Sequence, residues 1–393
     1  MRSLVFLSAA AATVMAGGYA IPESSINATA LSAAYVANAH GADAAYYNPA
    51  AMVYNDDANL LEVDATYIGL SPIDFSGTTG NYSSKKENFI VPTLHFSSTK
   101  VGDSGVRFGL SIVAPAGLSK RWDAAVPKAT AEEFTLQTVE FNPTIAFPLS
   151  DTVSAAAGLR IISSSGVVKS TYLVSRDMDG DSIDYGYNLA LMYKPTPALN
   201  LAATYRSNID LSIKGNAKLY SGATLAYNGD VSVSVPAPAS FNLAASYNFG
   251  HGTTVEAVYE RTMWSAYDYL DFNYPVSIGA LAPYFDDPKL KNWKDTNTYR
   301  LGLTQKYDQW TAMAGIAYDE TPVPTATLGY ELPDSDAVIV SLGGRYQIDP
   351  HWNIGLAGLV DMKKDRTVQN SAINGEFTNA RAYLVTAGIE YRF

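Results

Sequence analysis

Hydrophobic and polar residues alternate along most of the chain after about residue 58. The alternation has a period of two, which is typical of β-strands because successive side chains point to opposite faces. We count about fourteen such segments, each near the ~9–11 residues that a tilted membrane strand needs. The last segment is the clearest. We expect one face of it to contact lipid and the other to face a lumen, with the first set being Tyr383, Val385, Ala387, Ile389, Tyr391 and Phe393 and the second Ala382, Leu384, Thr386, Gly388, Glu390 and Arg392.

Short and long connections alternate between these segments. The short ones lie at 148–152, 194–199, 249–252, 307–309 and 348–351, and the long polar ones include 71–88, 116–133, 214–236 and 271–294. This asymmetry is typical of an outer-membrane barrel with short periplasmic turns and long external loops. A soluble β-sandwich, the alternative, has no reason to alternate so strictly. The pattern predicts an all-β transmembrane barrel of about 14 antiparallel strands over residues 58–393, in the cell outer membrane, with both termini in the periplasm.

The first 57 residues lack the alternation. Residues 1–20 have the layout of a signal peptide, with Arg2, an apolar run too short to cross a bilayer as a helix, and small residues at which cleavage after Ala16 or Ala20 both fit. A retained anchor helix is the alternative. Residues 21–57 could form short helices within 28–39, capped by Asn27 or Thr29. They either extend into the periplasm or fold into the lumen as a hatch. A hatch is physically reasonable because a barrel of this size is too wide for its own side chains to fill.

Composition removes several classes of function. The net charge of −11 argues against nucleic-acid binding, and the 0 Cys exclude thiolate chemistry. The 4 His have no spacing that suggests a metal site, and no phosphate loop or nucleophile motif is present. We therefore predict no cofactor, no metal and no enzymatic activity. The 27 Tyr suit the aromatic belts of a membrane barrel. A barrel enzyme would need a base, and His95 is the candidate that could lie inside.

Three sets of residues carry a family resemblance. The segment 33–39, then 43–50 with Asn48-Pro49-Ala50, then Met52, resembles the N-terminal hatch of the FadL/TodX family of outer-membrane transporters for long-chain fatty acids and aromatic hydrocarbons. The region of Pro115, Gly117, Leu118 and Trp122 fits as well, and the terminal Tyr391-Arg392-Phe393 resembles the signal read by the barrel assembly machinery. The resemblance implies a monomer with a helical hatch, external capture of a hydrophobic ligand, an inner pocket, and a lateral route opened by a hatch shift and a kinked third strand.

Candidate site residues follow from the cargo. A fatty acid has an apolar tail and one carboxylate, and a guanidinium can bind the carboxylate with two hydrogen bonds. Strand phase places four arginines in the lumen: Arg160, Arg206, Arg300 and Arg345. Their alternative partners are inward-facing acids, because buried charges need partners; these acids are Glu62, Asp64, Glu140, Glu256, Glu260 and Glu390. We expect apolar residues of the external loops to capture the hydrophobic ligand, and packing of these residues among themselves is the alternative. They are Leu118, Trp122, Phe134, Leu219, Tyr220, Leu225 and Tyr227.

The hatch triplet has two interpretations. Asn48 can bond the backbone through its amide and Pro49 fixes its own φ, which suits a loop that shifts between two states; a plain turn is the alternative. The function implied is passive uptake of hydrophobic molecules, above all long-chain fatty acids. The expected partners are the hydrophobic ligand and the lipid of the outer membrane. Uptake of aromatic or aliphatic hydrocarbons by the same route, a general porin, and an adhesive role of the loops are the alternatives.

Overall fold

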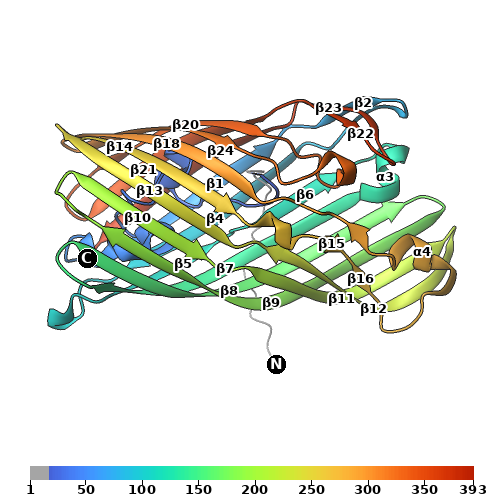
Figure 1. Ribbon diagram of the computed structural model, residues 1–393, viewed down its shortest axis with the longest axis horizontal. Coiled ribbons are helices and arrows are strands. Elements are labelled where there is room, and N and C mark those ends of the chain that lie inside the picture. Colours follow the sequence, from blue (N-terminus) through green and yellow to red (C-terminus); the bar gives the residue numbers. More distant parts are fainter. Residues whose placement is uncertain (1–16) are drawn as a thin grey trace.

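A computed structural model describes residues 17–393 as one long barrel whose strands run obliquely around its axis (Figure 1). Most of the predicted signal peptide, residues 1–16, lies outside the described residues. The barrel sheet consists of strand segments with the following bounds: β1 Leu60–Leu70, β4 Glu87–Ser97, β5 Arg107–Val113, β6 Gly117–Arg121, β7 Glu133–Pro148, β8 Val153–Thr171, β9 Val174–Tyr193, β10 Leu199–Arg206, β11 Ile209–Ser221, β12 Thr224–Ala237, β13 Ser240–Gly250, β14 Thr253–Thr262, β16 Phe272–Asn273, β18 Thr296–Tyr307, β19 Trp310–Asp319, β20 Ala337–Gln347, β21 Trp352–Lys363 and β24 Arg381–Arg392.

The sheet closes on itself. β1 pairs antiparallel with β24, over Leu60↔Arg392 to Leu70↔Ala382, and on its other edge with β4. Of the 18 segments in this sheet within residues 17–393, four pairs (β5/β6, β10/β11, β12/β13 and β14/β16) are successive pieces of one strand, which leaves 18 − 4 = 14 barrel strands. The first and last strands are therefore joined, and the prediction of a 14-stranded antiparallel barrel is confirmed.

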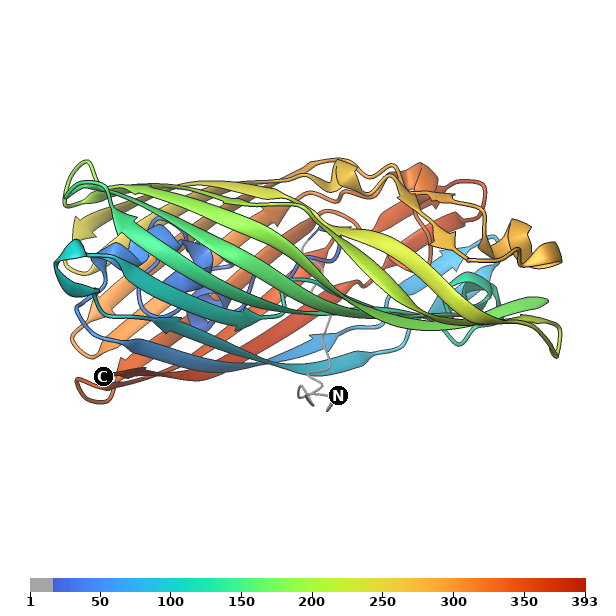
Figure 2. The same ribbon diagram turned by 90° about the horizontal axis from the view of Figure 1, so that it is seen from below.

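The two ends of the barrel differ. The turns at one end, beside the C-terminus, are short, whereas extended hairpins and small helices crowd the other end (Figure 2). The prediction of a long loop over 214–236 was wrong, because β11 and β12 continue through it as a hairpin with a turn at Gly222. β8 and β9, with 19 and 20 residues, are about twice the length that a tilted membrane strand needs. In residues 17–393, no helix is long and apolar enough to cross a membrane.

The outward face of β9 marks the apolar belt. From Tyr193 back to Ile183 every second residue is a large exposed apolar or aromatic one, with Ile183 61% and Tyr185 66% exposed. Beyond Ile183 the same face carries exposed aspartates, beginning with Asp181 and Asp179. About ten residues of apolar face are what a tilted strand needs to cross the hydrocarbon core. The long hairpin therefore extends past the belt into a polar zone.

Short helices fill the barrel at the end that carries the C-terminus (Figure 2). They are α1 Ile26–Ala30, α2 Ala44–Tyr47 and the 3₁₀ helix η1 Pro49–Tyr54. The predicted caps were wrong, because Ser25 caps α1 and its Oγ accepts from the Ala28 N–H at 3.2 Å. The helix stops at Ala30, since Ser32 and Ala33 adopt positive φ values of 49° and 58°.

Loops close the opposite end over an apolar core. The four strands of a small sheet cover part of this end: β2 Asp74–Gly77, β3 Gly80–Ser83, β22 Arg366–Gln369 and β23 Asn374–Thr378. The remaining elements are η2 Gly102–Ser104, α3 Ala125–Ala131, η3 Trp264–Ala266, β15 Tyr269–Leu270, η4 Gly279–Leu281, α4 Ala282–Phe285, β17 Lys289–Leu290 and η5 Thr325–Thr327.

Candidate functional site

The hatch lies directly on wall glycines. A Cβ on Gly315 of β19 would stand 2.2 Å from the carbonyl carbon of Leu31, and one on Gly343 would stand 2.7 Å from the Ala30 Cβ. Neighbouring strands approach α1 in the same way, since a Cβ on Gly355 would stand 2.9 Å from Ile26. These positions have no room for a side chain, so glycine allows the hatch backbone to approach the barrel wall.

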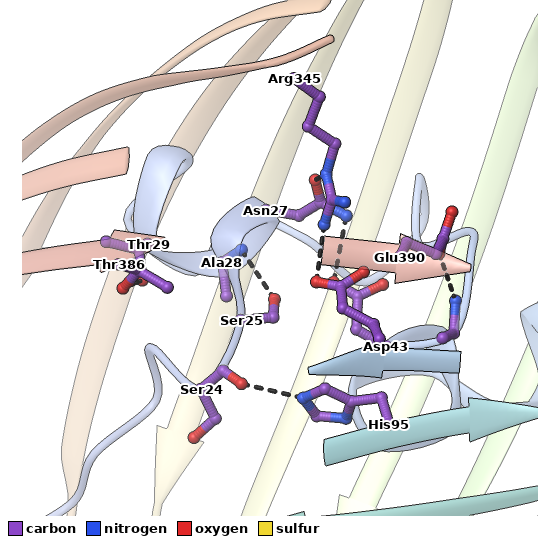
Figure 3. A network of polar contacts seen from close by, with 12 residues as sticks. Ser24, Ser25, Asn27, Ala28, Thr29, Asp43, His95, Arg345, Thr386 and Glu390 are labelled. Carbon is purple, nitrogen blue, oxygen red and sulfur yellow. Dashed lines mark hydrogen bonds and ion pairs between the residues drawn. The ribbon is translucent and has the colours of Figure 1, made fainter. Parts of the chain in front are cut away.

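Polar wall residues bond the hatch as well (Figure 3). Arg345 of β20 donates to Glu62 at 2.7 Å and, through Nε, to the Asn27 Oδ1 at 2.7 Å. Asn27 in turn donates to Asp43 at 3.0 Å. On the other side of the network, His95 Nε2 lies 2.9 Å from the Ser24 carbonyl oxygen, which can only accept, so this nitrogen carries the proton. The network joins α1 and α2 to the wall.

Two more wall residues bind the hatch backbone directly. Glu256 accepts from the N–H groups of Val36 at 2.8 Å and Ala37 at 2.6 Å. Arg300 donates to the Ser32 carbonyl at 3.1 Å while it pairs with Glu260 at 2.9 Å. Two of the four predicted carboxylate binders, Arg300 and Arg345, thus hold the hatch in the described chain. Both also pair with lumen acids, Arg300 with Glu260 and Arg345 with Glu62, as the alternative expectation had it.

The wall is incompletely paired beside the third strand. β4 and β5 pair from Leu94↔Ile112 to Ser97↔Gly109, whereas the rest of β4, toward Glu87, has no ladder with β6 in the described chain. The strand breaks at Pro115, which lacks an N–H and cannot continue a ladder. The N-terminal segment covers this break from inside: the Ile21 N–H donates to the Pro115 carbonyl at 2.9 Å, and the Gly117 N–H to the Tyr19 carbonyl at 2.9 Å.

A narrow apolar cavity with about 70 Å³ of free volume lies above this break, at the end with the long connections. Its lining is almost wholly apolar, as is usual for sites that bind hydrophobic ligands. Three charged residues border it: Lys291 and Glu331 pair with each other at 2.5 Å, and Asp179 is exposed. The apolar lining includes Leu118, Phe134, Met178, Val233, Phe272 and Trp293.

Tyr19 stands between this outer cavity and an inner one, with about 130 Å³ of free volume, over the hatch. Its ring packs edge-on against Trp264 at 4.7 Å, and 5.8 Å from Trp293, and its hydroxyl donates to the Pro236 carbonyl. Since Tyr19 lines both cavities, its ring is the partition between them. Tyr19 is not among the predicted site residues because it falls within the predicted signal peptide, residues 1–20.

The inner cavity carries the other two predicted arginines. Arg160 pairs with Glu140 at 3.0 Å, and Arg206 pairs with the same carboxylate. Two guanidinium groups share one acid, so the group has a surplus of one positive charge. One nitrogen of Arg206, Nη1, is buried without a hydrogen-bond partner in residues 17–393, and the Arg206 guanidinium lies 4.3 Å from the Tyr46 ring centre.

The predicted capture residues separate into three groups. Leu118 and Phe134 line the outer cavity. Leu219 and Trp122 are fully buried, and Trp122 donates to the Tyr330 carbonyl at 2.9 Å, so both pack the core beneath the loops. The other three lie on the β11–β12 hairpin, where Leu225 is 48% exposed; they are Tyr220, Leu225 and Tyr227.

The Asn48-Pro49-Ala50 triplet joins α2 to η1. The Asn48 amide donates to the Val36 carbonyl at 2.9 Å and its Oδ1 is buried without a partner in the described chain. Pro49 begins η1, and the Ala50 carbonyl accepts from Ser154 of the wall at 2.7 Å. The triplet therefore links three parts of the hatch and wall. Whether it moves stays a prediction.

The sequence and the fold are both similar to those of known outer-membrane transport proteins. A family model described as "Outer membrane protein transport protein (OMPP1/FadL/TodX)" matches residues 7–393. The chain is 22% identical to a long-chain fatty acid transport protein of Escherichia coli O6:H1 over 389 residues, covering 86% of this chain and 84% of that one. It resembles the crystal structure of a Pseudomonas aeruginosa FadL homologue with a TM-score of 0.84 at 21% identity, over 95% of this chain and 99% of that one. The toluene transporter TodX of P. putida gives a TM-score of 0.71 at 17% identity, over 96% and 99%.

Proposed function

This chain belongs to the outer membrane protein transport protein family (OMPP1/FadL/TodX), and from that premise we propose that it takes up long-chain fatty acids by passive diffusion through the hatch-plugged barrel. The observation that carries the proposal is the narrow, almost wholly apolar cavity beneath the long connections. An apolar cavity in the path through a barrel favours a hydrophobic solute, because a polar solute would lose its hydration there without compensation. Relatives that carry a fatty-acid name support the same cargo.

The inner cavity supplies a cation for the carboxylate. The Arg160, Arg206 and Glu140 group has one surplus positive charge and a free guanidinium nitrogen on Arg206. A bound carboxylate would complete its pairing with charge-assisted hydrogen bonds. These two arginines are the inner binding residues that we propose.

We propose that the substrate leaves sideways, through the unpaired wall between β4 and β6. The covering segment at Tyr19 and Ile21 is bonded to the strand break at Pro115 and Gly117. A shift of this segment with the hatch would uncover the break and connect the cavities to the lipid. Lateral exit avoids the hatch, which fills the lower lumen.

The orientation and processing of the chain follow from the same features. We propose that the end with the short turns faces the periplasm, that the barrel works as a monomer, and that the assembly machinery reads Phe393. Residues 21–57 then form the hatch and residues 58–393 the barrel. Cleavage after Ala16 fits better than cleavage after Ala20, because the latter would remove Tyr19, which is 3% exposed and packed against Trp264.

Uptake by whole cells tests the cargo. Initial rates of radiolabelled oleate and toluene uptake are measured in cells that lack the gene and carry the wild type, Arg160→Ala or Arg206→Ala. We expect oleate uptake to depend on the gene and to fall in both variants. If only toluene uptake depends on the gene, the protein is a transporter for hydrocarbons, and Arg160 and Arg206 do not bind a substrate carboxylate. If neither rate depends on the gene, the proposal is wrong and the loops should be tested for adhesion.

A general porin is the second candidate, and conductance separates the two. Glu256, Arg300 and Arg345 hold the hatch in the lumen. We therefore expect no large steady current when the purified protein is inserted in a planar bilayer. A large current would favour a porin, because porins leave an open aqueous lumen.

A further inference from the structure

Arg176 differs from the lumen arginines described above, because no other side chain neutralises it. It lies on β9 with its side chain on the same strand face as Met178, which lines the outer cavity. Within residues 17–393, its guanidinium has no hydrogen bond and no ion pair, and its Nε is buried without a partner. Its contacts are aromatic: the guanidinium carbon lies 5.2 Å from the Phe272 ring centre and 5.8 Å from that of Phe285.

Two acids near Arg176, Glu331 and Asp177, pair with other cations. Glu331 borders the outer cavity but pairs with Lys291 at 2.5 Å. Asp177, the next residue along β9, points to the opposite face of the sheet, where it is exposed and lies 3.5 Å from Lys169. The Arg176 side chain is half-buried, and its Nε is fully buried without a partner in the described chain. Cation–π contacts replace only part of the hydration that the guanidinium loses, so an anion at its N–H edge would complete the site.

Phe272 ties this guanidinium to the outer cavity, because the ring that contacts Arg176 also lines the cavity wall. Residues two apart on a strand face are separated by about 7 Å, so Arg176 stands one step from Met178 toward the tip of the hairpin. The two rings hold the guanidinium while its N–H edge has no acceptor. Nearby, two residues after Phe272, the Tyr274 hydroxyl is also buried without a partner in the described chain.

We propose that Arg176 binds the carboxylate of an amphiphile whose acyl chain fills the outer cavity, so that this residue selects fatty acids over neutral hydrocarbons at the first binding station. The inference rests on the proposed function, since it needs a hydrophobic ligand in that cavity. The guanidinium offers two parallel N–H donors to the carboxylate, and the Tyr274 hydroxyl offers a further one. The acyl chain would then run along Met178 toward Tyr19.

Equilibrium binding to the purified full-length protein tests this assignment, with radiolabelled oleate and oleyl alcohol as matched probes and protein-free detergent as the blank. Arg176→Gln removes the charge and Arg176→Lys keeps it. Lys218→Gln is the control, because Lys218 is an exposed cation beside Leu219, the residue that pairs with Arg176 across the strands. Heat-modifiable mobility on gels verifies that each barrel is folded.

We expect Arg176→Gln to weaken oleate binding about tenfold to a hundredfold, the range for a lost hydrogen bond to a charged group. Oleyl alcohol binding should stay unchanged, Arg176→Lys should recover part of the oleate affinity, and Lys218→Gln should match the wild type. Equal loss of both probes, or no loss of oleate, would overturn the role of Arg176 while leaving the cavity as a hydrophobic site. If the wild type binds neither probe, the proposed function itself fails. Should both Arg176 variants misfold, equal wild-type affinities for the two probes would overturn the assignment.

Discussion

Replacing Gly315 with alanine should release the hatch from the barrel wall. The new Cβ would stand 2.2 Å from the Leu31 carbonyl carbon and 2.4 Å from its oxygen. Carbon atoms in contact normally lie about 3.5–4.0 Å apart, so the hatch backbone or β19 must move by more than about 1 Å. Overpacking of this kind typically costs about 1–3 kcal/mol, which would raise the undocked population about 5- to 150-fold.

Hydrogen exchange of the peptide that spans residues 26–36 measures this undocking, because exchange of a protected amide follows the population of the open form. Gly358→Ala on β21 is the matched control, since the nearest atom to its new Cβ would be 3.9 Å away. We expect faster exchange over 26–36 in Gly315→Ala, with unchanged protection of the barrel strands. Exchange equal to that of Gly358→Ala would refute the claim that close packing on this glycine holds the hatch.

Three further perturbations address the hatch and its charges. Burial raises the pKa of Glu23 to about 8 from an ordinary 4.5, so its contribution to hatch stability is full below pH 4.5 and is lost as the pH rises through 8. The protection factor of this segment, which is corrected for the intrinsic pH dependence of amide exchange, should fall between pH 5 and 8, and Glu23→Gln should remove that fall. Asn48→Ala loses the bond to Val36, which should weaken the hatch by about 1 kcal/mol and speed its proteolysis, whereas unchanged cleavage would favour a plain turn. Arg345→Ala leaves Glu62 buried without its cation and should destabilise the protein by about 3–5 kcal/mol, seen as a lower temperature of heat modification; no change would mean that the pair is dispensable.

The barrel could be predicted from the sequence because each strand has one face in contact with lipid and the other in contact with the lumen. These two environments select apolar and polar side chains in alternation. The alternation around Tyr383 and Leu384 has the predicted phase, with the first 42% exposed and the second 1%. Length was harder to predict, since β8 and β9 continue past the apolar belt with the same period. The 214–236 region was taken for a loop because its polar side chains on both faces resemble one, although cross-strand pairing continues to Ser221.

The site could be predicted only in part. Strand phase placed Arg160, Arg206, Arg300 and Arg345 toward the lumen, where each pairs with an acid, because phase is a local property. Which of them holds the hatch and which faces a cavity depends on packing between distant segments, which periodicity does not encode. Arg176 escaped notice for the same reason: its lack of a partner becomes visible only when Phe272 and Phe285, about a hundred residues away, fold over it.

We propose that this chain alone lets a fatty acid cross an outer-membrane bilayer without energy input. Vesicles with a lipopolysaccharide outer leaflet, an entrapped fluorescent fatty-acid sensor and no energy source provide the test. We expect saturable entry of oleate into vesicles that contain the protein, faster than into protein-free vesicles. Equal rates with and without the protein would contradict it.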